Sequence, residues 1–154
     1  MKDFIIDANV LVKWVLPEAD HVESKSLIDA PVSLRAPDLI VSECVSIFLK
    51  RVMRKELTLE QSGKLLARLH DDYIDTRVRL IPARLMTDSA LEIAALEKVS
   101  AYDSIYLALA VQARCRLVTA DHRFLERIHS RELKKHLVSL TDPQLQIEIA
   151  ETKM

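Results

Sequence analysis

Four acidic residues stand where carboxylates are uncommon in a folded protein. Asp7 and Asp121 each follow a short apolar segment, residues 4–6 and 117–119, that predicts a buried strand. An Asp between a strand and a helix is often only an N-cap, so neither residue alone indicates chemistry. If the two strands are parallel neighbours, however, both carboxylates lie at the same edge of one sheet, where sites in parallel sheets form.

The other two acids interrupt apolar helical segments. Glu43 has Ile40 and Ile47 as helical neighbours, which places it on or beside an apolar face. Asp103 lies in the first turn of residues 101–114, a predicted helix that is apolar almost all round. Burying an unpaired carboxylate is costly. Pairing with a core Arg would satisfy Glu43, and the helix N-terminus would accommodate Asp103; from the sequence, both alternatives stay open.

Converging carboxylates would require a compensating charge. Two carboxylates about 4 Å apart repel by roughly 4 kcal/mol at an effective dielectric constant near 20, and a domain is stable by only about 5–15 kcal/mol. Protons or a cation must offset this repulsion, and oxygen ligands suit Mg²⁺ or Mn²⁺. No CxxC or HExxH motif offers zinc a site. An all-carboxylate Mg²⁺ site predicts phosphodiester hydrolysis, in which the metal polarises the phosphate and activates a water molecule.

The composition of the chain excludes some classes of protein and favours others. The 154 residues form one ordinary domain, and the net charge of −1 provides no global attraction to nucleic acid or membrane, although a local patch would escape that average. The one glycine, Gly63, excludes both GxGxxG and P-loop phosphate sites. Cys44 and Cys115 are expected to be free thiols in a reducing cytosol. Neither a signal peptide nor a membrane span is expected, which predicts a cytoplasmic protein.

Short apolar strands alternate with helices along the chain, which predicts an α/β fold with a parallel sheet. Strands are expected at residues 4–6, 32–35, 76–81, 117–119 and 137–140. Helices are expected at residues 9–16, 20–29, 39–55, 59–73, 87–98, 101–114 and 121–128. From Pro143 the signals are weak, so a domain of residues 1–142 and a loosely held tail of residues 143–154 are predicted.

Four blocks, in this order, resemble the motifs of PIN-domain ribonucleases of the VapC toxin type. They are IDANVLVKW at residues 6–14, PDL at 37–39 leading to Glu43, YDSIYLALA at 102–110 and LVTAD at 117–121. The resemblance covers nearly the whole chain. It implies a single PIN domain with a three-layer α/β/α fold and a central parallel sheet. It also implies a Mg²⁺-dependent endoribonuclease, the toxin of a type II toxin–antitoxin pair, whose products carry a 5′ phosphate and a 3′ hydroxyl.

The same resemblance implies a role for each acid. Asp7 and Asp103 would be the principal metal ligands. Glu43 would complete the shell and help to orient the attacking water. Asp121 would bind a second metal ion or act through water. His122, beside it, is a weaker candidate for a role near the substrate.

Polar and basic residues are expected around this cluster. Asn9 and Thr119 stand where the family has residues that support the site by hydrogen bonds. The residues that would contact RNA phosphates, if they line the groove, are Lys50, Arg51, Arg54 and Arg123. Solvated helix faces are the plainer explanation for such charges.

The resemblance also implies partners: an RNA substrate, a second copy in a homodimer, and a small antitoxin that inserts a segment into the groove. Most apolar residues of the middle helices are expected in the core, with some on a partner surface; they include Phe48, Leu65, Leu66 and Leu69. A non-catalytic PIN scaffold that binds RNA or a protein is the alternative. Phosphoryl transfer through an aspartyl phosphate ranks last, because it needs a second acid near the nucleophile and Asn9 stands there instead.

Overall fold

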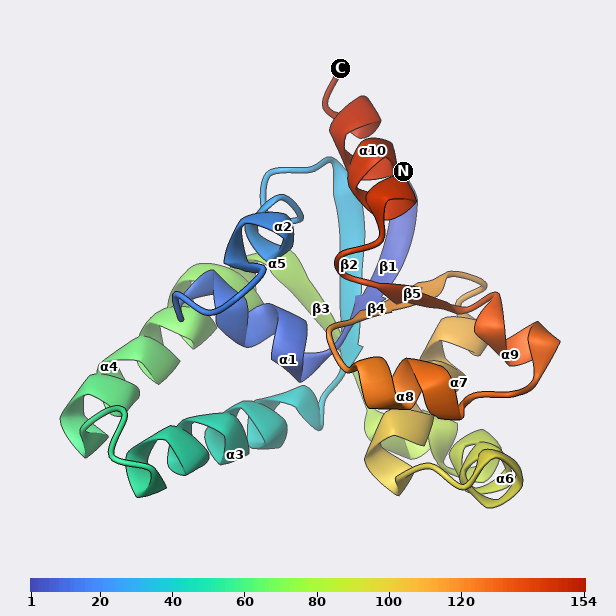
Figure 1. The fold of residues 1–154 in the computed structure, drawn as a ribbon, viewed down its shortest axis with the longest axis horizontal. Coiled ribbons are helices and arrows are strands. Elements are labelled where there is room, and N and C mark those ends of the chain that lie inside the picture. The colour runs from blue at the N-terminus through green and yellow to red at the C-terminus, as the bar shows by residue number, and fades with distance from the viewer.

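A five-stranded parallel sheet forms the centre of the molecule (Figure 1), in a computed structural model that describes residues 1–154. Its strands are β1 (Lys2–Ile6), β2 (Val32–Pro37), β3 (Val78–Ile81), β4 (Arg116–Thr119) and β5 (Leu137–Ser139). Their order in the sheet is β3-β2-β1-β4-β5, and every neighbouring pair is parallel. The predicted α/β class and parallel sheet are confirmed.

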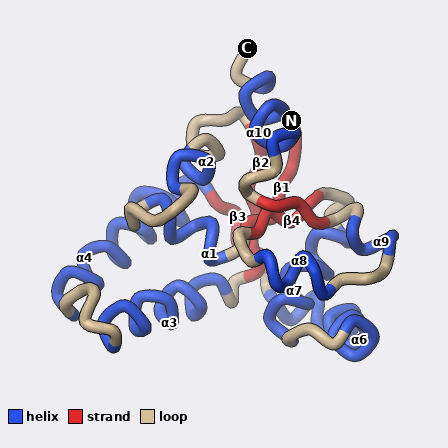
Figure 2. Tube along the Cα trace, in the orientation of Figure 1, coloured by secondary structure: helices blue, strands red, loops and turns tan.

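Helical segments fill every connection between the strands (Figure 2). Between β1 and β2 lie α1 (Ala8–Leu11), η1 (Val12–Trp14) and α2 (His21–Lys25). Between β2 and β3 lie α3 (Ile40–Met53), α4 (Leu59–Arg68), η2 (Leu69–Ile74) and α5 (Asp75–Arg77). Between β3 and β4 lie η3 (Ala83–Met86), α6 (Thr87–Glu97) and α7 (Ala101–Gln112). The helices α8 (His122–Arg127) and α9 (Arg131–Lys134) precede β5, and α10 (Pro143–Thr152) follows it.

The strand order contains one reversal of direction. The chain steps from β1 outward to β2 and β3, then crosses back to β4 and continues to β5. Because parallel crossovers are right-handed, this reversal places the helices of the β1–β2 and β2–β3 connections on one face of the sheet and those of the β3–β4 and β4–β5 connections on the other. The result is the three-layer α/β/α arrangement, with α7 packed against β1, β2 and β4. It also creates a switch point between β1 and β4, where ligands bind in such sheets.

Local signals explain where the main helices begin. Thr58 accepts a hydrogen bond from the backbone of Gln61, whose side chain binds the backbone of Thr58 in return, a complete capping box for α4. The Ser100 hydroxyl caps α7. Buried strand residues and the inner helix faces then form one apolar core, which includes Phe48 and Leu69 as predicted.

The predicted strand at residues 76–81 is shorter in the structure. The helical path from α4 continues through the π-helical segment η2 to Arg77, so β3 begins only at Val78. The Arg77 guanidinium donates to the carbonyls of Leu27, Ile28 and Ala30 at 2.7–3.1 Å. These bonds hold Arg77 against the turn before β2, and the alternating pattern of the sequence did not show them.

The tail is also more ordered than predicted, which corrects that expectation. Residues 143–152 form α10, begun by the Asp142 side chain with Pro143 in the first turn. Leu145 and Ile149 are fully buried, and Glu148 pairs with Arg116 of β4 at 2.5 Å. The apolar spacing of four residues, Leu145 to Ile149, therefore marks the buried face of a short helix.

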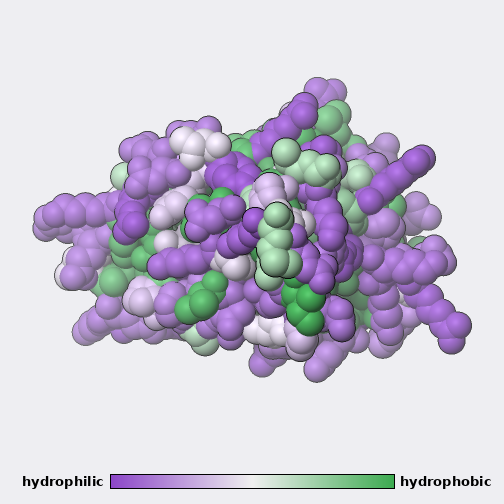
Figure 3. All heavy atoms as spheres, turned by 90° about the horizontal axis from the view of Figure 1, so that it is seen from above, coloured by the Kyte–Doolittle hydropathy of each residue, from purple (hydrophilic) through white to green (hydrophobic).

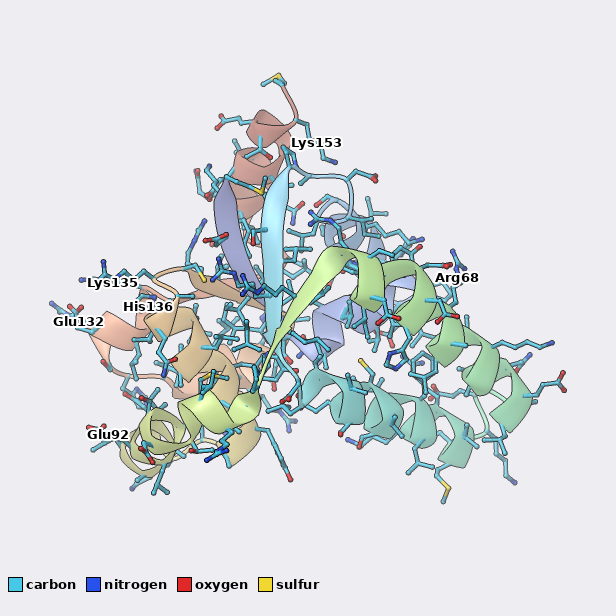
Figure 4. All side chains as sticks on the ribbon, turned by 180° about the vertical axis from the view of Figure 1, so that it is seen from behind. Arg68, Glu92, Glu132, Lys135, His136 and Lys153 are labelled. Atoms are coloured by element: carbon cyan, nitrogen blue, oxygen red, sulfur yellow. The ribbon has the colours of Figure 1, made fainter.

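The outer surface carries mostly charged and polar residues. Figure 3 shows the end of the molecule that bears the chain termini, where apolar residues form only small patches. Charged residues on the outer helices, including Arg68 of α4, Glu92 of α6 and Glu132 of α9, point outward (Figure 4). Among the helices, none combines the length and apolar character needed to cross a bilayer.

Candidate active site

The ends of β1 and β4 bring the first and last acids together. The two strands pair in parallel with Ile6 opposite Val118, and the backbone N–H of Asp7 donates to the Val118 carbonyl at 3.1 Å. Asp7 directly follows β1, and Asp121 comes two residues after the end of β4. Both therefore lie at the carboxyl edge of the sheet, at the switch point.

The Asp7 carboxylate is buried and does not act as a helix cap. Although Asp7 is the N-cap residue of α1, its side chain accepts no capping hydrogen bond. Its Oδ2 instead accepts from the Thr119 hydroxyl at 2.8 Å and from the Asn9 amide at 3.3 Å. Only 6% of the residue is exposed. The structure therefore removes the capping explanation that the sequence left open.

Asn9 and Thr119 join the two strand ends through hydrogen bonds. The Thr119 hydroxyl accepts from the backbone N–H of Asp121 at 3.1 Å while it donates to Asp7. The side-chain oxygen of Asn9 accepts from the backbone N–H of Ala120, also at 3.1 Å. Both residues thus lie beside the carboxylates, where the resemblance expects supporting residues.

Glu43 approaches the same place from the first turn of α3. It forms no ion pair, so the core-Arg alternative does not hold, and its Oε1 is buried without a hydrogen-bond partner. The hydroxyl of the fully buried Tyr106 is also without a partner. Burial raises the pKa of Glu43, the nearby Tyr106 hydroxyl lowers it in part, and the Asp103 charge raises it further.

Asp103 and Asp121 complete the cluster, each at the start of a helix. The Ser100 hydroxyl accepts from the backbone N–H of Asp103 at 3.1 Å, so the helix end is capped without the Asp103 carboxylate. Burial raises the pKa of Asp103, and the Asp121 charge adds to this effect. The carboxylate of Asp121 caps α8 by accepting from the backbone N–H of Phe124 at 3.1 Å. Asp121 therefore has a structural role in addition to its place in the cluster.

A proton or a cation is favoured at the strand end. Burial is the main cause that raises the pKa of Asp7, to about 7. The bond from Thr119 lowers this pKa, whereas the charges of Glu43 and Asp103 raise it. The mutual repulsion expected from the sequence is thus present in the folded chain.

All four acids line one cavity of about 630 Å³ at the carboxyl edge of the sheet. Helices α3 and α7, which both contribute lining residues, lie on opposite sides of the strand ends (Figure 1). Its other lining residues are Ala8, Asn9, Leu39, Ser42, Ser46, Ile47, Lys50 and Tyr102. The volume falls in the range of about 300–1,000 Å³ that is usual for ligand sites.

A sequence model of the PIN domain matches residues 4–129, which include all four acids. The chain belongs to the PIN domain family. Members of this family are generally nucleases, and they typically use divalent metal ions. The chain has no significant match among curated proteins.

Solved structures show the same fold at low sequence identity. PAE2754 from Pyrobaculum aerophilum is 17% identical, with a TM-score of 0.67 over 97% of this chain and 98% of that one. VapBC2 from Rickettsia felis, solved bound to a DNA fragment from its promoter, is 14% identical, with a TM-score of 0.59 over 89% and 98%. FitAcB from Neisseria gonorrhoeae is 17% identical, with a TM-score of 0.57 over 89% and 97%.

The donor set of this PIN domain fits a hard divalent cation. The cavity offers carboxylate oxygens, and the orphaned Oε1 of Glu43 is a buried acceptor that lacks a donor. The side chains do not, as they stand, form a group of three ligands around one point. Mg²⁺ is usually held by one or two carboxylates and keeps several waters. Two of these carboxylates would therefore suffice for a Mg²⁺ site, with Asp7 and Asp103 as the candidates.

A second cavity of about 290 Å³ adjoins the acidic one and shares Asn9, Ile47 and Lys50 with it. Three of the four predicted basic residues line it: Lys50, Arg51 and Arg54. Arg123 lines neither cavity and is exposed on α8. His122 is likewise exposed and lines neither cavity.

Sequence reasoning missed Lys13 and Glu18 in the second cavity. Lys13 is 7% exposed, and its ammonium donates to Glu18 at 3.2 Å and to the Ala19 carbonyl at 2.8 Å. Arg51 also pairs with Glu18. The only signal in the sequence was a lysine inside an apolar helical segment, which does not identify its partner.

Proposed function

We propose that this PIN domain is a Mg²⁺- or Mn²⁺-dependent endoribonuclease that hydrolyses RNA phosphodiester bonds. One observation carries the proposal: four carboxylates from separate parts of the chain line a single cavity, with Asp7 buried and Glu43 Oε1 lacking a partner. Such an arrangement destabilises the metal-free protein, so a structural role alone does not account for it.

Each side chain then has a task in the reaction. Asp7 and Asp103 would hold the cation, which supplies Lewis-acid polarisation of the phosphate and a lowered pKa for water. Glu43, which lines the cavity, orients the attacking water and accepts a proton from it. The Asn9 and Thr119 hydrogen bonds fix the carboxylate of Asp7. Asp121 would act through water or hold a second ion.

We also propose that the protein is the toxin of a VapBC-type pair, a cytoplasmic homodimer inhibited by a small antitoxin. The support is the fold, shared with the VapBC and FitAB toxin–antitoxin complexes. An exposed apolar stripe on α3 supports a protein partner; it consists of Val45, Leu49 and Met53, which are 48%, 56% and 75% exposed. Phe48 and Leu69 are in the core and are not available for this surface.

A non-catalytic scaffold remains the second candidate, favoured by the absence of a group of three ligands around one point. Calorimetric titration with Mg²⁺ separates the two, since a scaffold without metal chemistry needs no ion. Binding of Mg²⁺ that is lost in Asp103→Asn supports the nuclease.

The decisive experiment is RNA cleavage by the wild type, Asp7→Asn and Asp103→Asn, each with Mg²⁺ and with EDTA. We expect cleavage by the wild type in Mg²⁺ alone. The exposed Asp88→Asn on α6 is the matched control and should cleave normally. Cleavage that survives the chelator, or either substitution in the cavity, would overturn the metal mechanism.

A further inference from the structure

We propose that Tyr102 stacks an unpaired base of the RNA substrate and that Lys50 and Arg54 hold one of its backbone phosphates. This inference deepens the proposed function and rests on it. It follows from three features of the cavity lining: one exposed aromatic ring, two unpaired cations, and the continuity between the two cavities.

Tyr102 is the one exposed aromatic side chain of the seven in the protein, at 63% exposure. Trp14 and Tyr106 are buried, and Tyr73 packs its ring edge to face with Trp14 at 5.5 Å. The Tyr102 side chain makes no hydrogen bond and lines the acidic cavity next to Asp103. An aromatic face left open at such a site can stack a nucleobase of any sequence.

Lys50 of α3 and Arg54, the C-cap residue of that helix, are four positions apart and form no ion pair. Their neighbours in the second cavity differ, because Lys13 pairs with Glu18, and Arg51 pairs with Glu18 and Glu56. Glu18, the acid that lines this cavity, is thus already paired with Lys13 and Arg51. Lys50 and Arg54 keep their donors available, and a phosphate is the anion that nucleic acid presents.

The two cavities form a continuous path across the edge of the sheet. Lys50 lines both of them, whereas Tyr102 lines the acidic cavity from α7. Helices α3 and α7 lie on opposite sides of the strand ends in both views of the ribbon (Figures 1 and 4). A strand that crosses from Tyr102 to Lys50 therefore passes the carboxylates. Bases in a duplex are stacked on each other and cannot reach Tyr102, so the path favours a single strand.

The test measures binding separately from cleavage. A fluorescein-labelled 12-nucleotide RNA, single-stranded or annealed to its complement, is titrated in EDTA and followed by anisotropy at 50–200 mM NaCl. We expect Tyr102→Ala to weaken binding of the single strand by about 5- to 50-fold, and Tyr102→Phe to stay within about twofold of wild type, because the ring remains. The duplex should bind more weakly and be insensitive to either change.

The phosphate contacts have their own readout. Lys50→Ala and Arg54→Ala should each reduce the slope of log affinity against log salt concentration by up to about 0.7, the value for the one phosphate that the two cations share. Lys153→Ala removes the same charge beyond α10, at the end of the molecule opposite the cavity (Figure 4), and should leave the slope unchanged. Circular dichroism melts confirm that each variant is folded.

The outcomes separate this inference from the proposed function. Tyr102-dependent binding of the single strand without any cleavage in Mg²⁺ would uphold the RNA path and refute the nuclease. If the wild type cleaves RNA and Tyr102→Ala binds the single strand as tightly as the wild type does, the nuclease is upheld and the stacking site is overturned. Equal affinity for the duplex, or salt slopes that Lys50→Ala and Arg54→Ala do not change, would also overturn the inference.

Discussion

The hydroxyl of Thr119 donates to Oδ2 of Asp7 over 2.8 Å, and thereby joins two residues that are 112 positions apart in the chain. The same hydroxyl accepts from the backbone N–H of Asp121. Because Thr119 is fully buried, water cannot replace either bond. One side chain therefore sets the position of two of the four acids.

Thr119→Val should damage both stability and activity. Valine has nearly the same shape but leaves Asp7 Oδ2 and the Asp121 N–H without this partner. We expect the free energy of unfolding to fall by about 1–3 kcal/mol and cleavage to fall by about 10- to 100-fold. Urea denaturation and initial cleavage rates measure the two effects. Thr119→Ser keeps the hydroxyl and should retain most of the activity; equal losses in Thr119→Ser and Thr119→Val would show that the methyl group, not the bond, matters.

The stability of the metal-free protein should fall as the pH rises from about 4 to 7. The folded pKa of Asp7 is raised from 3.8 to about 7, so over this window the folded chain binds the proton more tightly than the unfolded chain does. The stabilisation that this proton provides is present below pH 4 and is lost by pH 7. The loss amounts to about 4 kcal/mol, at about 1.36 kcal/mol per pKa unit. Urea denaturation in EDTA across this range measures it.

Asp7→Asn should flatten that dependence and make the metal-free protein more stable at pH 8. The side chain then stays neutral and still accepts from Thr119. Asp88→Asn, at an exposed position on α6, should leave the dependence as in the wild type. An unchanged pH profile in Asp7→Asn would assign the titration to another group.

Added Mg²⁺ should stabilise the wild type at pH 8 but not Asp7→Asn. A ligand that binds only the folded chain adds about 1.4 kcal/mol when present at about ten times its dissociation constant. Thermal melts with and without Mg²⁺ test this, and the effect should shrink below pH 7 as protons compete for Asp7. Equal stabilisation of both proteins would place the ion elsewhere.

Replacement of Ile149 by alanine should show that α10 belongs to the folded unit. Ile149 is 1% exposed, and Ile149→Ala should lower the free energy of unfolding by about 2–5 kcal/mol. Ile147 on the same helix is 50% exposed and provides the matched control, with an expected loss within about 0.5 kcal/mol. Denaturation curves that do not distinguish the two would mean that α10 is not docked in solution.

Both thiols should be unreactive in the folded protein. Burial raises the pKa of Cys44 to about 12 and that of Cys115 to about 11, and the charges of Glu43 and Asp7 add to the first shift. Because the thiolate is the reactive form, iodoacetamide at pH 8 should label neither residue. In denaturant both should react, and mass spectrometry counts the adducts. Rapid labelling of the native chain would contradict the buried setting of Cys44.

The sequence by itself determined the class of fold and the four acids that are candidates for the site. Apolar segments such as residues 4–6 and 117–119 have few stable places except a buried parallel sheet. One carboxylate at a strand end or in an apolar helix has a structural explanation, but four that converge require protons or a cation. The four sequence blocks that resemble PIN-domain motifs indicated the PIN family, and the family match confirms it.

Only the tertiary structure decided what each side chain contacts. The sequence could not show that Asp7 binds Thr119 rather than a helix end, or that Arg51 is held by Glu18 while Lys50 and Arg54 stay unpaired. Nor could it show that α10 docks on the sheet through Glu148. These contacts join residues far apart in the chain, and they depend on strand order and helix placement. Local patterns of apolar and charged residues record which face is buried, but not which distant side chain meets it.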